Sequence, residues 1–466
     1  MARRKRKGPP DHRASDGSAI PPDFAARLPL RDEAERNALI NALETPSPVS
    51  IRLNPLKPFT LDAERVPWCD GGRYLAERPS FSLDPLLHAG AYYVQEASSM
   101  LLEQAILATG LNGRDVLALD LCAAPGGKST HLLALLTPGS LLVANELHPQ
   151  RRSILAENCW KQGALNVVIG GSRSSDLGAL PGEFDLILLD APCSGEGMFR
   201  KDAFARAQWS EDLVEQCAAA QHELIHNAWH ALSPGGALVY STCTWEPMEN
   251  EAQVAGLVAL GGECMELKLD SAWGIERSEL HGIIGYRCYP HRVRGEGFFM
   301  SVVRKPGGLE VRKLADATSA PSPWPWLIPA TGLQCIEREG VQYAQPFHWS
   351  SHLGRIGAAM RLVAPGIPFA ERKGDAWVPH AAAALSAGLD RRAVQVMELE
   401  QPDALRYLRG EALPARGAEG LALASFRGFG LGWMHGAGTR WNNRWPATWR
   451  LRLLRSDAPT VPWSKH

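Results

Sequence analysis

The chain has 466 residues, 49 lysines and arginines against 50 aspartates and glutamates, and 45% hydrophobic residues. This globular composition excludes a mainly disordered, collagenous or coiled-coil protein, and the length predicts about three domains. No apolar run approaches the ~20 residues that cross a bilayer, and the N-terminus has no apolar signal segment, so no membrane partner is expected.

The N-terminal third begins with a basic run, Arg3–Lys7, inside a segment rich in proline and serine. We predict a disordered basic tail over 1–22, which either touches phosphates or aids solubility. Residues 23–100 mix helical patterns with short segments, including a strand that starts at Ser50 and is stopped by Pro55. They predict a small α+β N-terminal domain.

Residues 101–305 alternate apolar runs with helical patterns, which predicts a parallel sheet covered on both faces. The segment 286–296 shows no helical pattern, so it is expected to be a loop, and the strand after it is expected to pair antiparallel at the end of the sheet. The strand candidates are Val116–Leu121, Leu141–Ala144, Leu186–Leu189, Ala237–Tyr240 and Gly297–Val303. The intervening helices are Ser129–Leu136, Pro149–Gln162 and Asp212–Leu232.

The C-terminal third divides by composition into a linker over 306–323, a connecting domain over 324–385 and a last domain over 386–466. From Arg427 to Ser456 there are six arginines, no acidic residue and five interleaved aromatic residues. Such a stripe favours RNA binding, since arginine stacks on bases and pairs with phosphate. The alternative is a hydrophobic core with a solvated basic rim.

A glycine-containing loop follows the first strand of residues 101–305 and opens a helix. Gly126 and Gly127 allow close approach of a ligand to the backbone, and the helix N-terminus offers free N–H groups. Glu146 follows the next strand, about 20 residues on, where a carboxylate can accept from both hydroxyls of a ribose. Together these features predict an adenosine-containing cofactor.

Two of the nine cysteines follow apolar strands at the same predicted sheet edge. Cys193 lies in Asp190-Ala191-Pro192-Cys193, and Cys243 lies in Ser241-Thr242-Cys243. A thiolate that adds to C6 of cytosine makes C5 able to attack a sulfonium methyl group, and a carboxylate that holds a proton at N3 assists the addition. The other seven thiols are expected to be reduced bystanders of a cytoplasmic protein, without disulfides or a metal site, because no pair has CxxC spacing.

These motifs resemble the NOL1/NOP2/Sun family of RNA cytosine-5 methyltransferases over about residues 50–305. The similarity rests on three central motifs at 122–128, 190–195 and 241–244, the last followed by Glu249-Asn250-Glu251. Further matches are Arg52-Leu53-Asn54-Pro55, Tyr93-Val94-Gln95-Glu96 and Pro290-His291. The resemblance implies a class I, Rossmann-like fold with S-adenosylmethionine as methyl donor.

The resemblance also implies roles for individual residues. Cys243 would be the nucleophile, Cys193 would assist product release, and Asp190 would lie near both the cofactor and the target base. Glu146 would bind the ribose. The cofactor loop comprises Cys122, Ala123, Ala124, Pro125, Gly126, Gly127 and Lys128.

The sequence lacks one feature of the family. Relatives usually carry an aspartate near the adenine of the cofactor, after the third strand, and no aspartate stands at that place here. Ser172 or Arg173 occupies that position, with Asp176 as a further candidate.

The C-terminal extension looks like that of the bacterial ribosomal branch of the family. It resembles a β-rich, PUA-like RNA-binding module, through Gly432-Trp433 and Arg444-Trp445-Pro446. The expected partner is ribosomal RNA, the 16S RNA of the small subunit, or the small ribosomal subunit itself, bound by a monomer.

Several alternatives stay open at the level of the sequence. The two cysteines could exchange roles, since Pro192-Cys193 resembles the Pro-Cys nucleophile of DNA cytosine methyltransferases. The substrate could be tRNA or DNA. The chain could also be a non-catalytic RNA-binding assembly factor that retains a cofactor fold.

Overall fold

The computed structural model describes residues 19–280, 282–309, 312, 324, 326–328, 332–452 and 463. The predicted basic tail lies outside these residues apart from 19–22, and so does most of the predicted linker over 306–323. Among the described residues, no helix combines the length and the apolar character needed to span a membrane.

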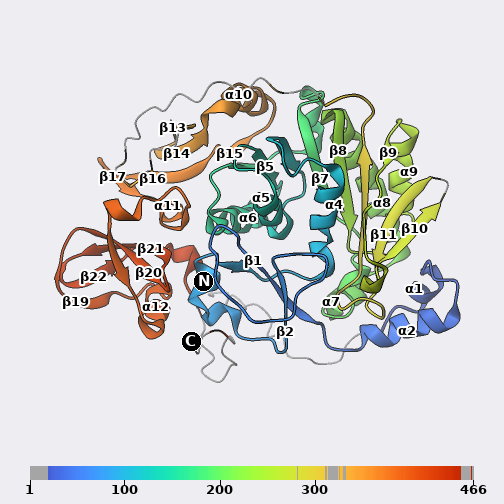
Figure 1. The fold of residues 1–466 in the computed structure, drawn as a ribbon, viewed down its shortest axis with the longest axis horizontal. Helices are drawn as coiled ribbons and strands as arrows, with labels where there is room; N and C mark the ends of the chain where they lie inside the picture. Colours follow the sequence, from blue (N-terminus) through green and yellow to red (C-terminus); the bar gives the residue numbers. More distant parts are fainter. Residues whose placement is uncertain are drawn as a thin grey trace, which may run out of the picture.

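A ten-stranded sheet forms the centre of the molecule (Figure 1). Its middle strands run in the order β8-β7-β4-β5-β6 and are parallel, as the sequence predicts. The bounds are β4 Leu117–Asp120, β5 Leu141–Asn145, β6 Val167–Gly170, β7 Phe184–Asp190 and β8 Leu232–Thr242. This is the Rossmann-like arrangement that the resemblance implies.

Helices cover both faces of this sheet. One apolar cluster joins the sheet to α4, α5 and α6, and a second cluster joins it to α8 and α9. The strands between these two layers are apolar on both sides for this reason. The helices are α4 Leu102–Thr109, α5 Gly127–Leu135, α6 Pro149–Gln162, α8 Glu211–Ala231 and α9 Glu251–Ala259, with the short α7 Ala203–Gln208 before α8.

Antiparallel strands extend the sheet beyond β8. The strand β12 (Phe298–Arg304) pairs antiparallel with β8, which confirms the expected pairing of the last strand. The expected loop over 286–296 is partly wrong, because 286–288 form the end of β11 (Ile283–Cys288) and pair with β12. A hairpin strand also lacks a helical pattern, so the absence of that pattern does not distinguish a strand from a loop. The edge is completed by β10 (Glu276–Leu280) and β9 (Glu263–Cys264).

The N-terminal segment is α+β, as expected. Its three-stranded antiparallel sheet has the order β2-β1-β3, and the short helix α3 leads into β3. The bounds are α1 Pro22–Arg27, α2 Glu33–Leu43, β1 Val49–Leu53, β2 Gly72–Leu75, α3 Pro85–His88 and β3 Tyr92–Tyr93.

The segment after the linker forms a four-stranded sheet and also contributes to the central one. The short strand β15 (Leu362–Ala364) pairs with β6 and lengthens the central sheet. The separate sheet consists of β13 Leu333–Arg338, β14 Val341–Pro346, β16 Ile367–Lys373 and β17 Ala376–Pro379, with the helices α10 Ser350–Ala359 and α11 Ala381–Leu385.

The last module is a five-stranded sheet of order β18-β20-β21-β22-β19 with one helix, drawn in red beside the blue N-terminal segment in Figure 1. Three tryptophans of the basic stripe, Trp433, Trp441 and Trp445, are buried in the apolar interior. For these rings the alternative of a hydrophobic core holds. The three tryptophans lie in β21, in β22 and in the loop after β22. The elements of this module are β18 Gln395–Glu398, α12 Gln401–Leu408, β19 Leu413–Ala418, β20 Leu421–Phe426, β21 Phe429–Gly436 and β22 Gly438–Asn443.

Candidate active site

The two candidate cysteines lie at the carboxyl ends of neighbouring parallel strands. In the register of β7 and β8, Asp190 stands opposite Ser241, so the two following loops leave the sheet side by side. The Sγ atoms of Cys193 and Cys243 are 3.2 Å apart. The sequence predicted a shared sheet edge, and the structure places the two thiols in hydrogen-bond contact.

Two buried glutamates hold these loops together, each from the opposite loop. Glu249 follows the Cys243 loop, and its Oε2 accepts the backbone N–H of Ser194 at 3.0 Å. Glu196 follows Cys193, and its Oε2 accepts the N–H of Trp245 at 2.9 Å. Because each carboxylate binds the backbone of the other loop, the pair fixes the position of one thiol relative to the other.

The contact between the thiols makes them chemically unequal. The hydrogen bond from Cys193 lowers the pKa of Cys243 against the opposing effect of burial, and the cations Lys128 and Lys201 add to this. The same hydrogen bond, together with burial, raises the pKa of Cys193. Of the two thiols, Cys243 is therefore the one that loses its proton more readily.

A lysine–aspartate pair stands beside the thiols. Lys128 Nζ lies 2.8 Å from Asp190 Oδ2, and Ser241 donates to the other carboxylate oxygen at 2.8 Å. Burial lowers the pKa of Lys128, but the Asp190 carboxylate outweighs burial and raises it. Lys128 thus stays a cation, and Asp190 is held between a charge and a hydroxyl.

The predicted cofactor loop borders a cavity of about 250 Å³ that also reaches Asp190 and Lys201. Gly126 has φ +113°, a conformation that favours glycine. Side chains of α6 hold the loop from behind, since Arg151 donates to the Ala124 carbonyl at 2.9 Å and Asn158 to the Pro125 carbonyl at 2.8 Å. Backbone groups of the loop therefore line the cavity in a fixed arrangement.

Asp120 was missed as a candidate, although it directly precedes this loop. It is buried at the end of β4, where Ser129 donates to its Oδ2 at 2.6 Å. Its Oδ1 has no hydrogen-bond partner among the described residues. Burial raises the pKa of Asp120 to about 7. An unpaired buried oxygen that borders the cavity fits a site for a cationic or N–H-bearing ligand group.

Glu146 lies at the end of β5, next to the cofactor loop, as expected. Its Oε1 accepts the N–H of His148 at 2.8 Å, and Arg151 approaches its Oε2 at 3.6 Å. The three candidates for the adenine contact have other partners in the chain. Ser172 Oγ accepts the N–H of Arg361, while Asp176 accepts the N–H of Arg173.

One buried group of possible metal ligands lies away from this site. The side chains of Cys69, Glu103 and His131 have ligand atoms within 4.8 Å of one another. Glu103 also accepts the N–H of Asp70, and the buried guanidinium of Arg52 bonds Thr130, the neighbour of His131. Structural zinc sites use four ligands, so the expectation of no metal stays a prediction here.

Comparison with known proteins covers most of the chain. Residues 108–304 match the family "16S rRNA methyltransferase RsmB/F", residues 20–97 match the N-terminal domain of 16S rRNA methyltransferase RsmF, and residues 394–451 match the RsmF PUA domain. The ribosomal RNA small subunit methyltransferase F of Erwinia tasmaniensis is 34% identical over 439 residues, which cover 84% of this chain and 88% of that protein. Its counterpart from Klebsiella pneumoniae is 32% identical over 455 residues, covering 87% and 91%.

Solved structures give the same answer for the fold. A methyltransferase homolog from Pyrococcus horikoshii is 29% identical, with a TM-score of 0.51 over 61% of this chain and 93% of that one. NSun6 from Pyrococcus horikoshii, solved with SFG, has a TM-score of 0.52 at 21% identity over 62% and 99% of the two chains. The chain therefore belongs to the RsmF family of ribosomal RNA small subunit methyltransferases, with a methyltransferase core between its N-terminal domain and a PUA domain.

Proposed function

We propose that this ribosomal RNA methyltransferase transfers a methyl group from S-adenosylmethionine to C5 of a cytosine in 16S ribosomal RNA, through a covalent bond between Cys243 and C6. The observation that carries the proposal is the pair of sulfur atoms 3.2 Å apart beside Lys128 and Asp190. A cytosine ring needs activation before C5 can accept a methyl group, and a thiolate supplies it.

The residues of the site match the needs of each step. The Cys243 thiolate adds to C6, and the electron pair of the C5–C6 double bond moves onto C5, while Asp190 holds a proton at N3. S-adenosylmethionine supplies an electrophilic methyl group to C5 when it is bound. A base then removes the C5 proton, the C5–C6 double bond forms again, and the C6–S bond breaks to return the thiolate. Cys193, the proton-bearing thiol, assists this release.

The cofactor loop fits this donor. The loop at 122–128 and Glu146 meet at the ends of β4 and β5, where backbone groups and a carboxylate can bind the methionine and ribose parts. The unpaired Asp120 Oδ1 is a suitable acceptor for the methionine ammonium group. The NSun6 structure with SFG shares this fold.

Bisulfite sequencing of ribosomal RNA from a deletion strain tests the proposed product. One or more cytosines of 16S RNA should lose bisulfite protection and regain it when the gene is returned. Loss of protection in tRNA alone, or in no RNA, would contradict the proposal.

Two single variants test the covalent step. Cys243→Ala should abolish both methyl transfer and any protein–RNA adduct, whereas Cys193→Ala should accumulate an adduct that survives denaturing electrophoresis. Adduct formation by Cys243→Ala would show instead that Cys193 is the nucleophile. Cys335→Ala, which alters an exposed thiol, is the matched control.

A further inference from the structure

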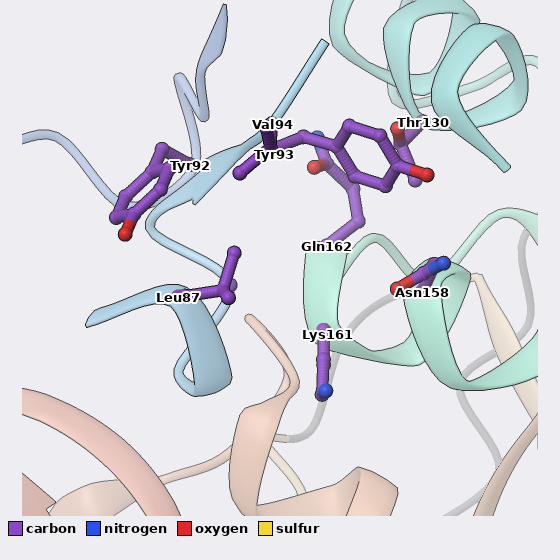
Figure 2. A pocket seen from close by; sticks show the side chains of 9 residues that line it. Leu87, Tyr92, Tyr93, Val94, Thr130, Asn158, Lys161 and Gln162 are labelled. Carbon is purple, nitrogen blue, oxygen red and sulfur yellow. The ribbon is translucent and has the colours of Figure 1, made fainter. Parts of the chain in front are cut away.

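A second cavity, of about 220 Å³, lies next to the cofactor cavity, between β3, α3 and α6 (Figure 2). Tyr93 and Val94 line both cavities, so the two sites lie on either side of these two residues. In Figure 2 the Tyr93 ring reaches from β3 toward Thr130, Asn158 lies across from the ring on α6, and Lys161 extends from α6 away from the ring. No step of the proposed reaction uses this cavity.

The lining of the second cavity indicates what it can hold. Its volume of about 220 Å³ has room for a single planar ring system. Its walls offer the ring of Tyr93 and the apolar side chains of Leu87 and Val94, which are suitable contacts for the faces of such a ring.

Two polar groups at the cavity are available to a ligand. Asn158 Nδ2 donates to the Pro125 carbonyl, which fixes the orientation of the amide and leaves Oδ1 without a donor among the described residues. In Figure 2 this oxygen faces the space between Lys161 and the Tyr93 ring. The Tyr93 hydroxyl also has no protein partner within the described part of the chain. Burial raises the pKa of Tyr93 to about 12, so the hydroxyl keeps its proton.

One face of α6 connects this cavity to other parts of the molecule. Four of its residues recur at helical spacing: Arg151 and Ile154 are exposed, and Asn158 and Lys161 are half-buried. The face begins at the cofactor loop, which Arg151 contacts, and ends where Lys161 lies over the ring of Trp449 in the PUA domain. A nucleic-acid strand that follows this face would reach the cavity beside the cofactor site.

We propose that this cavity binds one nucleobase of the substrate RNA, a close neighbour of the target cytosine, and that this base carries an exocyclic amino group. Tyr93 stacks against the base, and Asn158 Oδ1 accepts from the amino group. The inference rests on the proposed RNA-directed function, and it adds a second base-binding site to it.

An abasic scan tests the proposal. RNA oligonucleotides that span the cytosine mapped by bisulfite sequencing would carry one abasic residue at each flanking position in turn, and binding to the full chain would be measured by fluorescence anisotropy. One flanking position should stand out, with affinity reduced about five- to hundredfold, the range for loss of one stacked base. Replacing an amino-bearing base there with uracil should cost part of this loss.

Two variants connect that position to the cavity. The Asn158→Leu and Leu87→Trp proteins should each bind intact RNA as weakly as the wild-type protein binds the abasic RNA. With either variant, an abasic residue at that position should cause no further loss of affinity. Ser153→Leu, an exposed position on α6 away from the cavity, is the matched control and should keep the full difference. Leu87→Trp leaves the Asn158–Pro125 bond in place, so it separates filling of the cavity from disturbance of the cofactor loop.

Failure of this inference is distinguishable from failure of the proposed function. A methylated cytosine in 16S RNA and normal S-adenosylmethionine affinity in calorimetry, together with no distinct flanking position, would overturn only the inference. An unchanged abasic penalty in both cavity variants would overturn it as well.

Discussion

The two thiols of the site share a hydrogen bond that acts on them in opposite ways. It lowers the pKa of Cys243 and raises the pKa of Cys193. Removing the Cys193 thiol should therefore raise the pKa of Cys243 and reduce the fraction of thiolate at neutral pH.

Alkylation rates at the two positions measure this difference. With iodoacetamide at pH 7, followed by peptide mass spectrometry, Cys243 should be modified faster than Cys193. In Cys193→Ala the rate at Cys243 should fall about tenfold for each unit by which its pKa rises. The exposed Cys335 provides an internal reference. An unchanged rate at Cys243 would show that Cys193 does not stabilise the thiolate.

Asp120 makes the stability of the protein depend on pH. Its folded-state pKa is raised by burial from 3.8 to about 7, so between these values the folded state binds more protons than the unfolded state. Stability therefore falls as pH rises from about 4 to 7 and stays reduced above that range. The shift corresponds to roughly 4 kcal/mol at most.

Asp120→Asn should remove this penalty, because the amide carries no charge and can still accept from Ser129. Without cofactor, its Tm relative to wild type should rise between about pH 4 and pH 7 and level off above that range. Asp62→Asn, at an exposed position, should show no such trend. A constant Tm difference between Asp120→Asn and wild type across this range would contradict the burial argument.

At the level of elements, the loops after β7 and β8 are held by carboxylates that each bind the other loop. Removing either carboxylate leaves a backbone N–H unpaired and lets one thiol move. A displacement of about 1 Å in a reacting group can cost about a hundredfold in rate.

Glu249→Ala and Glu196→Ala should each lower kcat for methyl transfer about ten- to hundredfold while S-adenosylmethionine affinity stays unchanged, since the cofactor loop follows a different strand. Glu249→Gln keeps an accepting oxygen for the Ser194 N–H and should recover most of the rate. Glu215→Ala on the exposed face of α8 is the control. A parallel loss of cofactor affinity would indicate general damage rather than lost positioning.

The same loops show which parts of the site could be predicted from the sequence. Strand ends, the glycine loop and the pair of thiols were predictable because they depend on local pattern and on the rule that parallel strands end at one edge. Glu249 belongs to a recognised motif and Glu196 follows Cys193, yet their crossed bonds join residues about 50 positions apart and needed coordinates. The pairing of β6 with β15 could not be predicted from the sequence either, because β15 lies almost 200 residues downstream.

At the level of the whole molecule, the balanced charge conceals a local arrangement. The arginine-rich stripe left RNA binding and a hydrophobic core with a basic rim both open, and three of its tryptophan rings lie in the interior of the PUA domain. An aromatic residue in a strand packs in the core or contributes to a binding face, depending on which side of the sheet other elements cover. The sequence does not show which side is covered. The basic residues around them, such as Arg440, are exposed and stay available for phosphate contacts.

The C-terminus also secures the N-terminal domain. Trp463 donates from its indole N–H to Asp84 Oδ2 at 2.8 Å and packs against Tyr92, with ring centroids 5.2 Å apart. Asp84 in turn accepts from Tyr92 and from the N–H of Leu86, so it holds the segment between α3 and β3. Residues almost 400 positions apart therefore belong to one apolar cluster.

Trp463→Ala should destabilise this distant domain. Loss of a buried tryptophan costs about 3–5 kcal/mol, and the buried Asp84 carboxylate loses one of its three donors. Hydrogen exchange should therefore become faster in β1, β2 and β3, not only in the PUA domain. Trp463→Phe, which keeps an aromatic ring but not the N–H, should have an intermediate effect.

The Trp463→Ala variant should also weaken RNA binding, because Tyr92 and Tyr93 form β3 and line the second cavity. Its affinity for S-adenosylmethionine should be retained. Faster exchange confined to the PUA domain would mean that the N-terminal sheet holds its shape without the C-terminal contact.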